Sequence, residues 1–222
     1  MENKFKFSRF SVVVVAKDHN PSILNPDFLK INQIVPGDFE STETIVTPQV
    51  SLVKFKNNIT ITVESRKLQI VDDLDGNKRL EESLIADMAI KYIKKLPHVN
   101  YQSVGINFIG HIRINDPGKW IKSRFLREGE WDSEAHAVEK AEVKLFYKIN
   151  KAICTLTIEE MGLTQNLDGG NGILSVVVAN SNYHNEISLY PGDDAVVEVI
   201  KTWKNLLDNF KGLLKDVLKA EV

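Results

Sequence analysis

The sequence predicts an α+β fold in which a mainly antiparallel sheet is backed by two long helices. Residues 50–64 and residues 143–159 each contain two alternating runs around a short turn, which is the pattern of a β-hairpin with one buried face. Further along the chain, each hairpin is followed by a segment with apolar residues at helical spacing. The matched order indicates a tandem duplication of one strand–helix–hairpin–strand–helix unit.

The first α+β repeat is expected over residues 1–100. The nearly continuous apolar run of residues 10–16 favours a strand buried on both faces. The elements expected after it are a short helix (27–34), a polar loop (36–48), the hairpin with its turn at Asn57 and Asn58, a third strand (67–71) and a helix (80–96) that Pro97 stops.

The second α+β repeat is expected over residues 101–222, packed with the first as one globular unit. It opens with a long apolar-biased strand, residues 104–114. The elements expected after it are a short helix (120–126), a charged loop (128–137), the hairpin with its turn at Asn150 and Lys151, a flexible connection (164–172), a strand (172–179), a polar loop (181–194) and a long helix (194–220).

Two resemblances bear on the fold. The order of elements in the two halves resembles the TATA-binding-protein-like architecture, a duplicated strand–helix–strands–helix unit. The strand at residues 104–112, with Gly105, Ile106, Phe108 and Ile109, resembles the "G-L-R-Y-I-N" strand of a sporadically distributed, uncharacterised family of bacterial proteins of similar length. Asn107 stands where that family has Arg. This resemblance implies a bacterial protein and no particular active-site residues.

Composition and charge favour a globular cytoplasmic protein and disfavour a nucleic-acid-binding one. The chain has 222 residues, 43% of them hydrophobic, which is enough to bury a substantial core. There are 14 basic and 13 acidic residues before Asn100, and 14 and 17 from there onward, so neither half has the excess of basic residues typical of nucleic-acid binding. A single cysteine and no recognisable signal peptide or apolar stretch of membrane-spanning length favour a cytoplasmic protein.

The motifs that would carry catalysis or a cofactor are weak. No pair among the histidines and Cys154 has the spacing of zinc ligands, and Cys154 alternates within a strand as a small core residue would. Residues 164–172 contain three glycines, but a strand and not a helix is expected after them, so a phosphate cradle is disfavoured. We therefore expect no catalytic residues, no cofactor and no metal.

Partner binding has more support in the sequence. Trp131 lies in a charged loop, where it either anchors a partner or folds back over the sheet edge. We expect Trp131, Tyr183 and His184 to form a loop cluster that contacts a partner, together with the sheet face left free by the helices.

The last helix raises a second expectation. Its apolar stripe continues through Phe210, Leu214 and Val217, further than the first-repeat helix extends. We expect residues 210–218 to project past the sheet and dock on a partner or on a second copy. The alternative is that the segment covers the end of its own sheet.

The function expected from these observations is a non-enzymatic bacterial protein-interaction or assembly module. One alternative is a nucleic-acid-binding saddle, which the architecture allows and the charge balance disfavours. Another is an enzyme or small-ligand binder with a pocket between the two halves.

Overall fold

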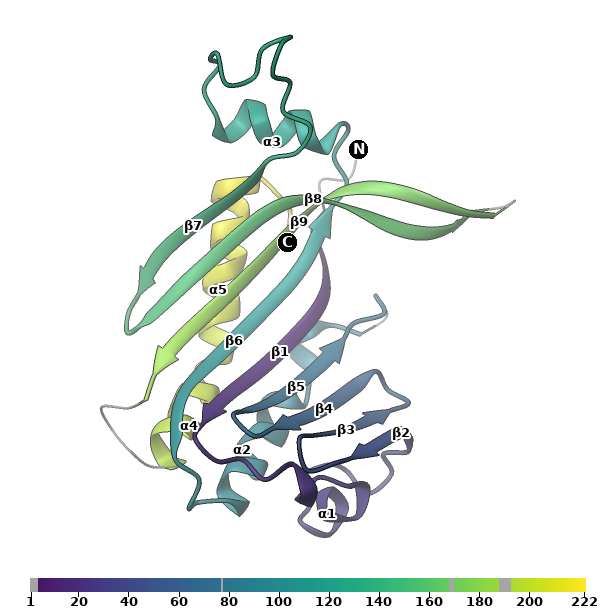
Figure 1. The fold of residues 1–222 in the computed structure, drawn as a ribbon, viewed down its shortest axis with the longest axis vertical. Coiled ribbons are helices and arrows are strands. Elements are labelled where there is room, and N and C mark those ends of the chain that lie inside the picture. The colour runs from purple at the N-terminus through teal and green to yellow at the C-terminus, as the bar shows by residue number, and fades with distance from the viewer. Residues whose placement is uncertain (1–3, 77, 168–169, 188–192) are drawn as a thin grey trace.

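The computed structural model of the chain describes residues 4–76, 78–167, 170–187 and 193–222. The first half contains five strands and the helices between and after them (Figure 1). In chain order the elements are β1 (Lys6–Ala16), a 3₁₀ turn (Pro21–Ile23), α1 (Pro26–Ile31), β2 (Ser41–Val46), β3 (Val50–Phe55), β4 (Ile59–Glu64), β5 (Lys67–Asp73), a 3₁₀ turn (Leu80–Glu82) and α2 (Ile85–Lys95).

The second half contains four strands, two of them much longer than the rest. In chain order the elements are β6 (Tyr101–Ile112), α3 (Pro117–Phe125), β7 (Glu142–Ile149), β8 (Ala152–Leu167), β9 (Gly170–Glu186), α4 (Asp193–Lys201), α5 (Trp203–Leu213) and a π-helical turn (Leu214–Leu218). Within the described part of the chain, no helix is both long and apolar enough to span a membrane.

The nine strands form one antiparallel sheet in the order β2-β3-β4-β5-β1-β6-β9-β8-β7. The expected mixed α+β class with an antiparallel sheet is therefore what the structure has. β1 and β6 pair at the centre, where Phe10 lies opposite Phe108. Both predicted hairpin turns are present, and Asn58 (φ 64°) and Asn150 (φ 54°) adopt the left-handed backbone that asparagine tolerates.

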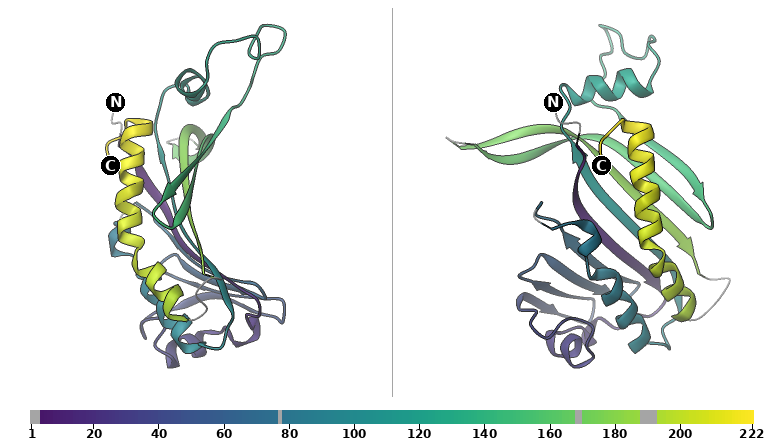
Figure 2. Two further views of the ribbon diagram at one scale, coloured as in Figure 1. Left: turned by 90° about the vertical axis from the view of Figure 1, so that its left-hand side faces the viewer. Right: turned by 180° about the vertical axis from the view of Figure 1, so that it is seen from behind.

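The helices α2, α4 and α5 all cover the same face of the bent sheet, which leaves the other face open (Figure 2). The core lies between the helices and the central strands. Phe108 stacks on Phe10 at 5.2 Å and on Phe210 at 5.9 Å between ring centroids, and Phe10 stacks on Trp203 at 5.1 Å. Along β1, side chains point alternately to the covered face and to the open face, and Val12 and Val14 are buried under the helices.

The expectation that residues 210–218 project past the sheet is wrong, because the segment packs on its own chain. Phe210 and Leu214 are fully buried, and Val217 packs partly buried against the same core. The ring of Phe210 lies 6.0 Å from Phe5 and 6.1 Å from Phe7, at the start of β1. The predicted strand was too short. β1 begins four residues before it, at Lys6, and this extra length supplies the surface that the helix covers.

The prediction of a polar loop at residues 181–194 is also wrong, because residues 181–186 belong to a strand. β9 continues to Glu186 and pairs with β6 on one side and β8 on the other. Residues 188–192 of that prediction lie outside the described residues. The sequence does not reveal a strand here because Ser181, which is buried on the covered face, is polar and Tyr183 is the one large apolar ring between Asn180 and Glu186.

Residues 164–167 and 170–172 of the predicted flexible connection belong to a two-stranded arm. Residues 168 and 169 of that prediction lie outside the described residues. β7 pairs with β8 only as far as Glu159, and β6 pairs with β9 only from Val177. Beyond those residues β8 and β9 pair with each other, so residues 160–167 and 170–176 leave the sheet together. This segment, called the arm below, extends sideways from the molecule (Figure 1).

Candidate functional site

The structure does not bring together the three residues of the predicted loop cluster, Trp131, Tyr183 and His184. Tyr183 is fully buried on the helix-covered face of β9, where its hydroxyl donates to Oδ1 of Asn209 at 2.8 Å. The prediction that Tyr183 belongs to an exposed loop cluster is therefore wrong. Burial raises the pKa of Tyr183, chiefly by desolvation, so the phenol stays protonated.

His184 points to the other face of β9, which the helices leave open. Its Nε2 lies 2.8 Å from Oε1 of Glu186, and the side chain is 43% exposed. Gly105 and Ile153 are its neighbours on β6 and β8. His184 therefore belongs to the open sheet face and not to a loop.

Trp131 lies far from both, in the segment that follows α3 at one end of the molecule (Figure 1). Its side chain is 42% exposed, and its indole N–H donates to the carbonyl oxygen of Arg127 at 2.9 Å. That bond is local, so it fixes the indole relative to its own segment.

Trp131 lines a groove of about 710 Å³, called the Trp131 groove below. α3 supplies one side of the groove, the following segment supplies the other, and the root of the arm closes the end. The lining residues are Asp116, Gly118, Lys119, Lys122, Ser123, Leu126, Glu128, Gly129, Trp131, Asp132, Glu139 and Glu160.

A lysine on α3 clamps the segment that carries Trp131. Lys122 Nζ lies 2.8 Å from Oδ2 of Asp132 and donates to the carbonyl oxygen of Val138 at 3.1 Å. The backbone N–H of Val138 donates to the other oxygen of Asp132 at 2.9 Å. The Lys122 hydrogen bond, and then the Val138 one, lower the pKa of Asp132. This closed set of contacts shapes the groove before any ligand arrives.

The groove is acidic although the whole chain is nearly neutral. Five carboxylates and two lysines line it, and one lysine, Lys122, is matched by Asp132. Asp116 caps α3 by accepting from the N–H of Lys119 at 3.1 Å. Glu128 and Glu139 add negative charge to the groove that Trp131 lines. An exposed aromatic face among carboxylates attracts cations through both the ring quadrupole and Coulomb attraction.

The acidic groove was only partly visible in the sequence. The acids beside Trp131 are local, but Asp116, Glu139 and Glu160 come from a helix cap, the end of the loop and a distant strand. Glu160 approaches α3 so closely that a Cβ on Gly118 would lie 2.8 Å from Oε2 of Glu160. Only folding brings these carboxylates to one groove.

The open sheet face is a second surface available for binding. Its centre is polar and uncharged, and Asn107 Nδ2 donates there to Oγ of Ser11 at 3.1 Å. Phe146 (69% exposed) and Ile153 (54% exposed) lie near the β7 edge. The Arg9 guanidinium on this face pairs with Asp73 at 2.6 Å, which reduces the positive charge that a nucleic-acid saddle needs.

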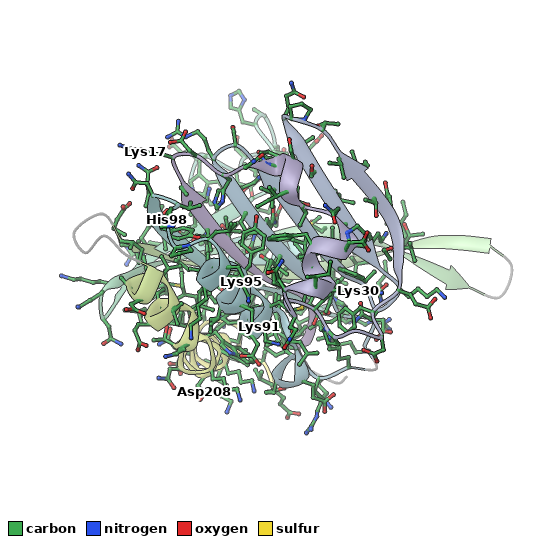
Figure 3. All side chains as sticks on the ribbon, turned by 90° about the horizontal axis from the view of Figure 1, so that it is seen from below. Lys17, Lys30, Lys91, Lys95, His98 and Asp208 are labelled. Carbon is green, nitrogen blue, oxygen red and sulfur yellow. The ribbon has the colours of Figure 1, made fainter. Side chains whose placement is uncertain are left out.

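Lysines gather instead at the end of the molecule opposite the Trp131 groove. Figure 3 shows Lys91 and Lys95 of α2 with Lys30 on one side and Lys17 and His98 on the other. Lys95 lies in the last turn of α2, where a cation complements the helix dipole. These positively charged side chains are spread over that end of the molecule, and none of them lines the Trp131 groove.

Cys154 is a buried core residue, as the sequence predicts. Desolvation is the largest influence on its thiol and raises the pKa to about 11, so the thiol is not a ready nucleophile. Among the described residues, no three His, Cys, Asp or Glu side chains gather closely enough to hold a metal ion. No protein-family model matches the chain, and no curated protein matches it in sequence.

Proposed function

We propose that the protein is a non-enzymatic bacterial protein-interaction module that holds a lysine- or arginine-rich segment of a partner in the Trp131 groove. The observation that carries the proposal is an exposed tryptophan fixed among carboxylates in a preformed groove. Tryptophan and arginine contacts dominate many protein interfaces, and a cation over an indole face contributes roughly 0.5–2 kcal/mol.

The contacts around Trp131 support binding more than catalysis. Lys122 and Asp132 neutralise each other, and Ser123 donates its hydroxyl proton to the carbonyl oxygen of Trp120 at 3.1 Å. Asp116 is engaged as a helix cap. The remaining carboxylates, led by Glu128 and Glu139, form a field for a cation without a neighbouring nucleophile among the described lining residues.

Binding of a basic probe peptide tests the proposal. We expect a fluorescent ten-residue arginine peptide to bind at low salt, and the Trp131→Ala and Glu128→Gln variants to bind it more weakly by roughly ten-fold and three-fold. Phe146→Ala is the matched control, because it removes an exposed aromatic ring from the open sheet face. Equal loss in Trp131→Ala and Phe146→Ala, or no loss in either, would refute the role of the groove.

The nucleic-acid saddle remains the alternative from another class. The Arg9–Asp73 ion pair reduces the positive charge on the open face, which favours weak binding at most. We expect no shift of duplex or single-stranded DNA in a gel at sub-micromolar protein and physiological salt. A shift that Arg9→Gln abolishes would move the proposed function to the open face.

We also infer that the two halves are a diverged tandem duplication, as in the TATA-binding-protein-like architecture. The neighbour order β1-β5-β4-β3 in one half matches β6-β9-β8-β7 in the other. Both short helices, α1 and α3, begin with proline after an Asn25 or Asp116 cap. Superposition of residues 10–96 on residues 104–218 in an experimental structure tests the inference, and different strand directions in the two halves would refute it.

A further inference from the structure

A second hollow lies where the two halves of the chain meet at the root of the arm. Its volume is about 340 Å³, and it is called the basic pocket below. β1 and the residues before it supply one wall, the end of β6 and the residues after it supply another, and β9 closes it. The lining residues are Lys4, Lys6, His111, Arg113, Ile114, Asn115, Leu174 and Ser175.

The strand register explains why the basic side chains converge. Lys6 on β1 lies opposite His111 on β6, next to a bulge in β1 between Phe7 and Arg9. Gly110 permits the close approach at this point, since a Cβ there would lie 2.4 Å from the carbonyl oxygen of Lys6 and 2.3 Å from the Phe5 ring. The basic pocket is therefore built by the β1–β6 pairing.

The charge of the basic pocket is unbalanced. Three cations and a histidine line it, and no carboxylate is among the described lining residues. The ion pairs found among the described residues include none of Lys4, Lys6 and Arg113. Burial, and then the charges of Lys6 and Arg113, lower the pKa of His111. Unpaired like charges in one hollow cost free energy that an anion would recover.

We propose that the basic pocket binds the phosphate groups of a small anionic ligand. Arg113 supplies a planar fork suited to phosphate oxygens, and Lys4 and Lys6 supply further charged donors. The side-chain amide of Asn115 adds a neutral donor. The volume exceeds that of a single phosphate, which favours a diphosphate or a phosphate ester over the free ion. This site is separate from the Trp131 groove and does not depend on the proposed function.

Calorimetric titration of the full chain with inorganic pyrophosphate tests the site. We expect binding that Arg113→Gln and Lys6→Gln each weaken by roughly ten-fold and that Arg113→Lys partly restores. Lys148→Gln, which removes an exposed lysine from β7, is the matched control and should change affinity less than two-fold if the effect is local. Inorganic phosphate, a mononucleotide and citrate compared under the same conditions distinguish the free ion, a phosphate ester and a carboxylate ligand.

The pKa of His111 can be measured in the wild-type protein, so this second test needs no charge-changing substitution, which can itself disturb folding. The charged groups around the imidazole include Lys6 on β1, Arg113 directly after the end of β6, Lys4, and Glu160, which accepts from Ser175 at the arm root. Glu221 pairs through its backbone with Lys4. Pyrophosphate bound among them should raise the pKa of His111, measured by NMR, by roughly one unit. No binding at millimolar pyrophosphate, an unmoved His111, or equal losses in Lys6→Gln and Lys148→Gln would each overturn the proposal. Pyrophosphate binding should be unchanged in Trp131→Ala, so failure here is distinguishable from failure of the groove.

Discussion

The hydroxyl of Ser175 donates to Oε1 of Glu160 at 2.6 Å across the two strands of the arm root. Glu160 lines the acidic Trp131 groove, and Ser175 lines the basic pocket. One hydrogen bond thus joins the walls of two hollows of opposite charge. A charge change at Glu160 acts on both, because each lies within a few ångströms of the carboxylate.

The first prediction concerns Glu160→Gln, which keeps the side-chain shape and removes the charge. Affinity of the groove for an arginine peptide should fall by roughly two- to five-fold, and affinity of the basic pocket for pyrophosphate should rise by a similar factor. Glu159→Gln, one residue earlier on the opposite side of β8, is the control. Titration of both variants with both probes measures these changes. If the affinities for the two probes change in the same direction in Glu160→Gln, the two-hollow description is wrong.

The second prediction concerns the clamp on the Trp131 segment. Lys122→Met should leave Asp132 without its cation and release residues 126–141 from α3. We expect faster amide hydrogen exchange in that segment and a lower affinity of the Trp131 groove for the arginine peptide. The free energy of unfolding should fall by about 1–2 kcal/mol. Lys140→Met, which removes a more exposed lysine 3.4 Å from Glu159, should change none of these. Unaltered exchange in Lys122→Met would show that the segment is held by other contacts.

The third prediction concerns acid stability. His19 is 5% exposed, and burial lowers its pKa below the ordinary 6.5, an effect that its contact with the carbonyl oxygen of Val14 only partly offsets. The unfolded chain therefore binds more protons at this site than the folded chain does. The free energy of unfolding should fall as pH drops below about 6.5 and level off below the folded pKa.

Urea unfolding of the wild type and His19→Gln at several pH values between 5 and 8 measures this dependence. In the variant, the free energy of unfolding should depend less steeply on pH. The remaining dependence should come largely from His111, because burial also lowers the pKa of that residue. An equal slope in wild type and His19→Gln would show that the protonation of His19 is not coupled to folding.

The fourth prediction concerns the C-terminal helix. Phe210→Ala should lower the free energy of unfolding by about 3–5 kcal/mol, because the ring fills the space between Phe5, Phe7 and Phe108. A chain truncated after Asn209 should be molten or insoluble. Phe146→Ala should cost less than about 0.5 kcal/mol, since that ring is 69% exposed. A folded, soluble truncation product would contradict the core assignment of this segment.

Local patterns predicted the elements whose partners are near in sequence. The two hairpins appear where the alternation indicates them, and Asn58 and Asn150 take the positive φ expected of their turns. Trp131 is exposed in a charged segment, which the flanking acids suggest. β9 was missed beyond residue 179 because the covered face of this part of the strand carries the polar Ser181 and a single large apolar ring, Tyr183.

Amino-acid order alone determined the α+β class, the hairpins and the apolar stripe of the last helix, since these depend on neighbours two to four residues apart. The tertiary structure decided where that stripe goes: the start of β1 extends far enough to bury Phe210. It also decided which charges meet, because Lys6 reaches His111 across 105 positions and Glu160 joins the groove from a distant strand. Charges that are far apart in sequence interact only when they are close in space. The short distances between them exist only after the strands of the sheet have paired.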